Sequence, residues 1–560
     1  MTGSAQAIAQ QASLLAAQGN NVDAAALYAR GLAEFPHDAR FANSAGNFHF
    51  KRGELDQALT LFERALELAP DLVEAGVNAA ITLGRLGRPE RAAALLGPLE
   101  QAGANNSGYW RVRADSERQA GRHREASASI ARAQALDPGN PKTARSRARL
   151  ALERSEPDAP AQIEAALNLN RGDPNLLFDY AQALALHGRL AEALEYSGAL
   201  VSQLPGWVEA HTLHAELRWA SGDRESFSDH FASTAAKPGA DPKIYLAWSA
   251  VLDGVDRPAE SAAILARARS IWPDDPALAL AQAVSLGEAG EAVAAQGVFQ
   301  QFASIADPDW KVARGRNLVR LGEIAAAEDT LAQALAARPD DVGAWALIDL
   351  CWRLEGNARH EWLHGQPGLV RQIALPLDQS ERDSITALLL ELHRHSAMPI
   401  GQSVKRGSQT KGALFARAEP ELARLEAALH EAMAEYRAGL PAVDPTHPLL
   451  ARRNDPWRIA GSWSILLDGE GHHAAHIHPR GLLSSASYWL VPDEVDAPGQ
   501  RGWLELGNPP PGLAEALGSL HTIRPAAGTL VLFPSTLYHG TRPISEGTRM
   551  TVAFDVTPTA

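Results

Sequence analysis

Three histidines in the C-terminal part of the chain have the clearest capacity for chemistry. His476 and His478 stand two positions apart in GHHAAHIHPRG, and His539 follows His478 by 61 residues in FPSTLYHGTRP. On an extended segment, positions i and i+2 point to the same side. A third imidazole can then close a facial set of three, and imidazole binds iron, zinc, copper and nickel. The pattern predicts a metal site, whereas the adjacent His472 and His473 are expected to be solvated.

An arginine and a threonine further along the chain could bind an anion beside these histidines. Arg549 follows His539 by ten residues in RMTVAFDV, and Thr551 stands two positions later. A guanidinium group can clamp a carboxylate through two hydrogen bonds, and a nearby hydroxyl can assist. We therefore expect a carboxylate-binding position on this segment.

Short strands are expected to position these side chains. Five segments combine alternating or apolar β-type residues with Gly and Pro boundaries, and few helical patterns separate them: 457–467, 484–491, 502–506, 528–534 and 549–556. Two helical patterns, 380–397 and 419–438, precede them. This order predicts an antiparallel sandwich or jelly roll with flanking helices, over residues 359–560.

The first 358 residues show a different organisation, an internal repeat. Glycines recur at intervals of 34 in three series: Gly19, Gly53, Gly87 and Gly121; Gly188 and Gly222; Gly322 and Gly356. Gly254 and Gly290 are interpreted as continuing the ladder with altered spacing, and the unit around Ser155 lacks its glycine. A small residue stands five positions after many of these glycines, at Ala24, Ala58, Ala92, Ala126, Ala193, Ala295 and Ala327.

Each repeated residue has a physical role in a helical hairpin. The glycine permits a tight turn between two helices, the alanine lets them approach closely, and a proline ends the second helix. GELDQALTLFERALELAP, residues 53–70, is the clearest copy. The 34-residue period resembles the tetratricopeptide repeat. The resemblance implies an all-α superhelical solenoid of about ten units over residues 1–358, whose concave face binds a protein or peptide.

Composition excludes several classes of protein. The 560-residue chain has a formal net charge of -14 and no long basic run, so nucleic-acid binding is not expected. Its single cysteine, Cys351, rules out a disulfide within the chain and is expected in a core. No signal-peptide pattern and no long apolar run are present, so we expect a cytoplasmic protein that does not contact a membrane. The oligomeric state does not follow from the sequence.

Four segments of the C-terminal part together resemble the 2-oxoglutarate- and Fe(II)-dependent oxygenases, in particular a bacterial and phage branch with an H-x-H-P motif. Here that motif is His476 to Pro479. The other three segments are a serine-rich strand ending in Tyr488, the run from Gly528 to His539, and Arg549 to Phe554. GQSVKRGSQTKGALF also resembles an upstream segment of the family, with Ser408 where threonine is usual. The similarity covers about residues 366–558, and the family fold is a double-stranded β-helix, or jelly roll.

The resemblance implies a cofactor and a set of site residues. His476 and His539 would bind Fe(II), and Arg549 with Thr551 would hold the distal carboxylate of the co-substrate 2-oxoglutarate. O2 would be the oxidant, and a C–H bond of the substrate would be hydroxylated. Gln409, together with Gln402, is expected to line the pocket. Tyr488 is expected to contribute to cofactor binding.

One position departs from the family pattern. The usual facial triad has two histidines and a carboxylate, but His478 stands where the acid is expected. His478 may itself bind the metal, which is our preferred reading, or Asp468, Glu470 or Glu505 may supply the carboxylate. In the remaining case, water or an anion fills the third position.

The two parts of the chain together suggest a function. We expect a dioxygenase that hydroxylates a protein or peptide recruited by the repeats. One alternative is a three-histidine metal dioxygenase that does not use 2-oxoglutarate. The other is a non-catalytic repeat scaffold with a degenerate oxygenase domain. Desaturation or halogenation instead of hydroxylation also stays open.

Overall fold

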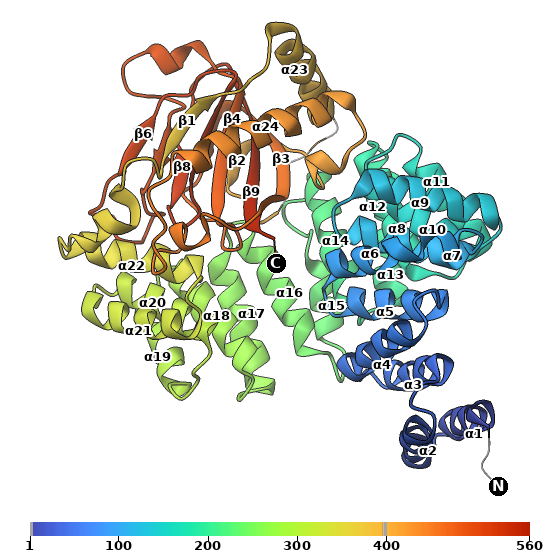
Figure 1. The fold of residues 1–560 in the computed structure, drawn as a ribbon. Helices are drawn as coiled ribbons and strands as arrows, with labels where there is room; N and C mark the ends of the chain where they lie inside the picture. Colours follow the sequence, from blue (N-terminus) through green and yellow to red (C-terminus); the bar gives the residue numbers. More distant parts are fainter. Residues whose placement is uncertain (1–3, 395, 397–399, 560) are drawn as a thin grey trace. The chain divides into compact units, whose positions relative to one another are not determined.

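The computed structural model describes residues 4–394, 396 and 400–559, and Figure 1 gives the element labels used below. Its contacts divide the chain into two compact units, 1–180 and 181–560. The change from repeats to strands that we predict at 358/359 falls inside the second unit. Among the described residues, no helix combines the length and the apolar character needed to cross a membrane.

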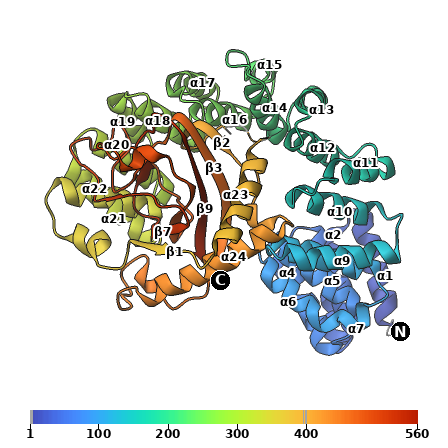
Figure 2. The same ribbon diagram turned by 90° about the horizontal axis from the view of Figure 1, so that it is seen from above.

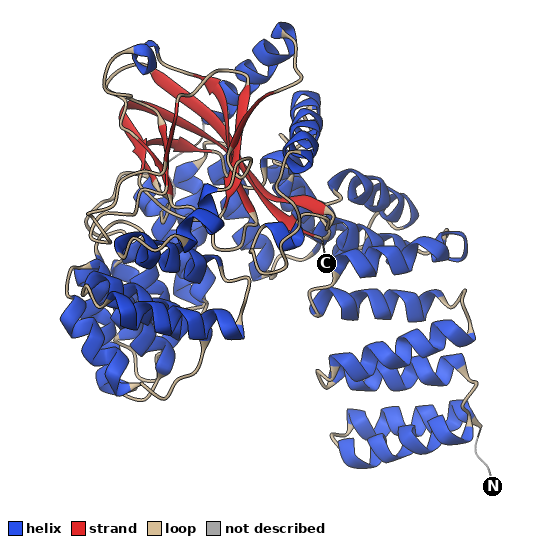
Figure 3. Cartoon of the chain, turned by 60° about the vertical axis from the view of Figure 1, so that its left-hand side comes forward, coloured by secondary structure: helices blue, strands red, loops and turns tan. Residues whose placement is uncertain are grey.

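Helices follow one another without strands up to residue 354. Those in the first unit are α1 (Ala5–Ala17), α2 (Asn21–Glu34), α3 (Ala39–Lys51), α4 (Leu55–Leu68), α5 (Val73–Arg85), α6 (Pro89–Leu96), α7 (Glu100–Gly103), α8 (Ser107–Gln119), α9 (His123–Leu136), α10 (Pro141–Glu153) and α11 (Ala159–Leu169). Helix α12 (Pro174–Leu186) crosses the boundary between the units. The second unit continues with α13 (Leu190–Gln203), α14 (Val208–Ala220), α15 (Asp229–Ala235), α16 (Pro242–Asp253), α17 (Pro258–Ile271), α18 (Pro276–Glu288), α19 (Ala292–Gln301), α20 (Pro308–Arg320), α21 (Ile324–Ala337) and α22 (Val342–Leu354). The predicted helical repeat is confirmed, and Figure 3 shows the helices stacked as successive hairpins.

The turns between paired helices need a left-handed backbone, which explains the glycine ladder. The predicted turn glycines have φ between +66° and +94°, with one exception. Gly254 lies at φ -65°, and Asp256 takes the turn conformation at φ +61°. Our assignment of Gly254 to the ladder is therefore wrong: Asp256 restores an unbroken 34-residue spacing from Gly222 to Gly290, because Asp tolerates the left-handed region better than most residues.

The degenerate repeat unit keeps the same turn without glycine. Ser155 stands 34 residues after Gly121 and has φ +48°. The seven alanines of the repeat are all fully buried, as close helix packing requires. The register therefore continues through the weak units because backbone conformation, more than residue identity, defines it.

The C-terminal part forms two antiparallel sheets. The six-stranded sheet has the order β1 (Arg371–Ala374), β7 (Thr529–Pro534), β4 (Leu483–Leu490), β9 (Thr548–Pro558), β3 (Trp457–His473) and β2 (Val404–Gln409). The three-stranded sheet has the order β6 (His521–Ile523), β5 (Leu504–Leu506) and β8 (His539–Thr541). All five predicted strands are present, and β1, β2, β6 and β8 are additional.

The two sheets pack face to face around a shared apolar core. Tyr488, Val531 and Phe533 of the larger sheet meet Leu504 and Leu506 of the smaller one. Early strands alternate with late ones in the larger sheet, an interleaving that is compatible with the predicted jelly roll.

Helices cover the outer faces of this sandwich. Helices α23 (Gln379–His393) and α24 (Pro420–Ala438) pack against the larger sheet, and the repeat helices α20 to α22 contribute to a core with residues beside the smaller sheet. Figure 2 shows these two groups of helices on different sides of the strands. Helix α23 is shorter than the predicted 380–397, because the chain turns at Ser396, whose N–H donates to His393 O. Residues 395 and 397 of that prediction lie outside the described residues.

Candidate active site

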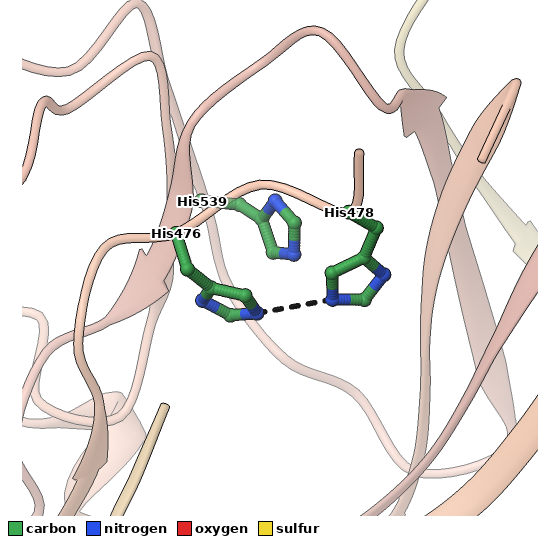
Figure 4. Close-up of side chains that lie close together, drawn as sticks. All are labelled: His476, His478 and His539. Carbon is green, nitrogen blue, oxygen red and sulfur yellow. Dashed lines mark hydrogen bonds between the residues drawn. The ribbon is translucent and has the colours of Figure 1, made fainter. Parts of the chain in front are cut away.

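The three predicted histidines come together between the two sheets. His476 and His478 lie in the connection from β3 to β4, and His539 begins β8. The backbones of His476 and His539 pair directly, with N···O distances of 3.0 and 2.9 Å. One potential ligand atom from each of the three rings lies within 4.8 Å of the other two, and Figure 4 shows the rings facing one another.

Hydrogen bonds to backbone carbonyls orient two of these rings. His476 Nδ1 lies 2.8 Å from Ala474 O, and His539 Nδ1 lies 3.1 Å from Leu537 O. Each carbonyl favours the tautomer with the proton on Nδ1, which leaves Nε2 free to bind a metal.

A carboxylate orients the third ring. His478 Nδ1 hydrogen-bonds to Asp555 Oδ1, and His478 Nε2 lies 3.1 Å from His476 Nε2. Partners of this kind raise the basicity of an imidazole ligand. Sequence reasoning missed Asp555, although a signal existed: Arg549, Thr551 and Asp555 alternate on one strand and therefore face the same side.

The three acids considered from sequence lie elsewhere. Glu470 pairs with Arg406 at 2.8 Å, Glu505 pairs with Arg542 at 2.9 Å, and Asp468 is exposed. Within the described residues, the group able to hold a metal contains the three histidines and no carboxylate.

Burial keeps the imidazoles of the site neutral. It lowers the pKa of His476 to about 4, and it lowers the pKa of His539 well below the ordinary value. The expectation that His473 is solvated is wrong: burial also lowers its pKa, and its Nδ1 lies 3.2 Å from Ser403 Oγ. The neutral form is the one that binds metals, so no proton has to be displaced from these two ligands near pH 7.

Arg549 has an unusual environment for an arginine. Its side chain is 1% exposed, and its Nε and Nη1 atoms have no hydrogen-bond partner among the described residues. The guanidinium carbon lies 5.2 Å from the centre of the Tyr488 ring, and burial lowers the pKa of Arg549. A buried cation without a counter-ion is costly, so this arrangement calls for an anion from outside the chain.

A cavity of about 960 Å³ joins these groups, within the size range of small-molecule sites. Arg549, Thr551, Gln402 and Gln409 all line it, together with the three histidines. Tyr488 does not: it is fully buried beneath the guanidinium group, where its pKa is raised by burial.

The repeat array also contributes to the wall of this cavity. Ala250, Asp253, Gly254 and Asp256, at the end of α16 and in the following turn, line the same space as the histidines. Gly254 O accepts a hydrogen bond of 3.0 Å from Gly401 N, which fixes the turn beside the segment leading into β2. Nothing in the local sequence indicates this contact, because the two segments are about 150 residues apart.

Comparison with known proteins supports the two-part organisation. Residues 461–555 match the family described as "Putative 2OG-Fe(II) oxygenase". Residues 10–72, 49–115 and 312–357 match tetratricopeptide repeat families. No curated protein is similar enough to the chain to count as a match.

Solved structures with similar folds include several tetratricopeptide repeat proteins. One from Parabacteroides merdae is 14% identical, with 44% of this chain and 97% of that chain covered and a TM-score of 0.37. One from Thermus thermophilus is 25% identical, with coverages of 32% and 99% and a TM-score of 0.27. PilF of Pseudomonas aeruginosa is 18% identical, with coverages of 37% and 95% and a TM-score of 0.31. The chain thus combines tetratricopeptide repeats with a 2OG-Fe(II) oxygenase-family domain matched over residues 461–555.

Proposed function

We propose that this protein is an Fe(II)- and 2-oxoglutarate-dependent dioxygenase that hydroxylates a protein or peptide substrate recruited by its repeats. The observation that carries the proposal is a buried, unpaired Arg549 in the same cavity as three converging imidazoles. One group is suited to an anion and the other to a metal, and 2-oxoglutarate chelated to iron satisfies both.

The donor set fits iron. His476, His478 and His539 would hold the metal through Nε2, while the Nδ1 partners keep the rings in place. Asp555 supplies negative charge one step behind the metal, through His478, where the usual triad supplies it directly. Bound Fe(II) with 2-oxoglutarate supplies the activation of O2 for hydroxylation.

The chain's own residues bind and orient the reactants. Arg549 provides the charge for the distal carboxylate, and Thr551, two positions along β9, places a hydroxyl on the same side of the strand. The wall formed by the α16 turn brings the repeats to the edge of the cavity, so a peptide held by these repeats lies close to the metal. This proximity is the reason for favouring a protein substrate.

An anaerobic titration with Fe(II) and 2-oxoglutarate, followed by visible absorption, tests the cofactor assignment. The wild-type protein should develop a weak charge-transfer band that His476→Ala abolishes. Arg549→Gln should weaken 2-oxoglutarate binding by about 2 kcal/mol or more, or at least about 30-fold, because a buried charge pair loses one partner. Arg524→Gln is the matched control, since Arg524 is half-exposed and pairs with Asp496 on the surface.

The departure at His478 favours one rival function, a three-histidine dioxygenase without 2-oxoglutarate. Iron binding without a band, and turnover that Arg549→Gln leaves unchanged, would establish this rival. The peptide assignment has its own test. A library of synthetic peptides and a set of free small molecules are each assayed for succinate release, and stimulation by small molecules alone refutes a peptide substrate.

A further inference from the structure

The segment that carries His539 is anchored residue by residue. Thr536 makes a side-chain hydrogen bond, Leu537 offers its carbonyl to His539 Nδ1, and Tyr538 is a buried aromatic side chain. His539 then pairs with the backbone of His476. The first and third of these anchors lead away from the cavity, toward the repeat array.

Thr536 is held by a histidine that follows the last repeat helix. Its Oγ1 lies 2.9 Å from Nε2 of His364, in the turn Glu361–Gly365, and both residues are buried. His364 Nδ1 lies 3.0 Å from Asp349 Oδ1 on α22, although the angle is outside that of a hydrogen bond. An imidazole with its proton on Nδ1, toward this carboxylate, accepts the Thr536 hydroxyl proton at Nε2.

Tyr538 enters the apolar core of the last repeats. It is 3% exposed and belongs to one cluster with residues of α20 and α22, among them Leu318, Leu347 and Trp352. Successive residues of an extended chain point to opposite sides, so the tyrosine that enters the repeats directs the next residue, His539, into the cavity.

A second side chain of α22 fixes the neighbouring loops. Arg353 donates hydrogen bonds of 2.6 Å to Gly507 O and to Gly518 O, which flank the segment between β5 and β6. Gly507 N in turn donates to Tyr538 O at 2.7 Å. Helix α22 therefore contacts the smaller sheet at several points around the His539 segment.

We propose that the last repeat positions the metal ligand His539, with His364 and Thr536 as positioning residues, so that the repeat array is a structural part of the metal centre. The inference rests on the proposed metal site for its functional consequence. Because coupling between two sites is reciprocal, a ligand that shifts α22 would change the metal affinity, and metal binding would stabilise the last repeat.

The test uses the full-length chain with Thr536→Val, which removes the hydroxyl at nearly constant volume, and Thr536→Ser, which keeps it. Thr330→Val is the matched control, because its hydroxyl bonds only to Ala326 O within helix α21. Hydrogen exchange measured by mass spectrometry reports on residues 536–541 without metal. Anaerobic titration with Fe(II) alone gives the dissociation constant, and thermal unfolding reports global stability.

We expect Thr536→Val to speed amide exchange in residues 536–541 about fivefold, the loss of one hydrogen bond, and to weaken Fe(II) binding about tenfold. Thr536→Ser should restore both, and Thr330→Val should change neither at a similar unfolding midpoint. Unchanged exchange in residues 536–541 overturns the inference, whatever the metal does. A wild-type chain that binds no Fe(II) refutes the proposed function instead, while the exchange result still decides whether His364 and Thr536 position the segment.

Discussion

Replacing Asp555 with alanine should weaken metal binding although Asp555 is not expected to touch the metal. Its carboxylate accepts the Nδ1 proton of His478, and the two side chains are only 22% and 15% exposed. Without it, the ring can rotate away from the position in which its Nε2 lies 3.1 Å from His476 Nε2. The site also loses its nearest negative charge.

The size of the effect follows from the type of contact. A hydrogen bond to a charged group contributes about 1.5–3 kcal/mol, and loss of such partners lowers metal affinity about 10- to 100-fold. We therefore expect Asp555→Ala to raise the Fe(II) dissociation constant within that range. Asp555→Asn keeps an acceptor oxygen but not the charge, so its loss should be smaller, about threefold to tenfold.

Competition between the protein and a coloured Fe(II) chelator under anaerobic conditions measures this constant. Asp468→Ala is the matched control, because it removes an exposed carboxylate of β3 that lies outside the histidine group. If Asp555→Ala binds Fe(II) as tightly as wild type, His478 is not held by Asp555 in the metal complex. If Asp468→Ala shows the larger loss, the carboxylate of the site comes from β3 and the three-histidine assignment is wrong.

Three further predictions concern other parts of the chain. Gly540→Ala should reduce Fe(II) binding, because its Cβ would lie 2.9 Å from His473 O, whereas Gly297→Ala, with open space around it, should not; equal affinities would contradict this. Burial lowers the pKa of His393 to about 4, so its contribution to stability is complete above about pH 6.5 and is lost as pH falls toward 4. Urea midpoints at pH 7.5 and 5 should therefore differ less in His393→Gln than in wild type, and an equal difference refutes this. Burial raises the pKa of the Cys351 thiol to about 12, so iodoacetamide should label it only after unfolding; labelling of the native protein would show that the thiol is accessible.

Local patterns were enough for the repeats and for most of the strands. The helical hairpins depend on a 34-residue period and on small residues at helix contacts, both of which are visible without knowledge of the tertiary structure. The five predicted strands were found because alternation and Gly–Pro boundaries are local signals. The short strands β1, β2, β6 and β8 carry no such signal, since pairing with neighbours rather than propensity makes them strands.

The sequence also indicated which side chains meet at the site, because the i, i+2 relation of His476 and His478 is a local property of extended chain. Only the tertiary structure decided what surrounds them. The partner of His478 is Asp555, 77 residues away, and none of the three acids proposed from sequence joins the group. The absence of a described partner for the Nε and Nη1 atoms of Arg549 is a property of the packed interior that composition cannot reveal.

The role of the repeats in the site is likewise decided by the fold. By sequence, they form a separate array that recruits a substrate. In the structure, Asp253 of α16 lines the cavity, and Tyr538 beside His539 packs into the core of the last repeats. Such contacts join residues more than 180 positions apart, and they depend on how the second unit packs as a whole rather than on any local pattern of residues.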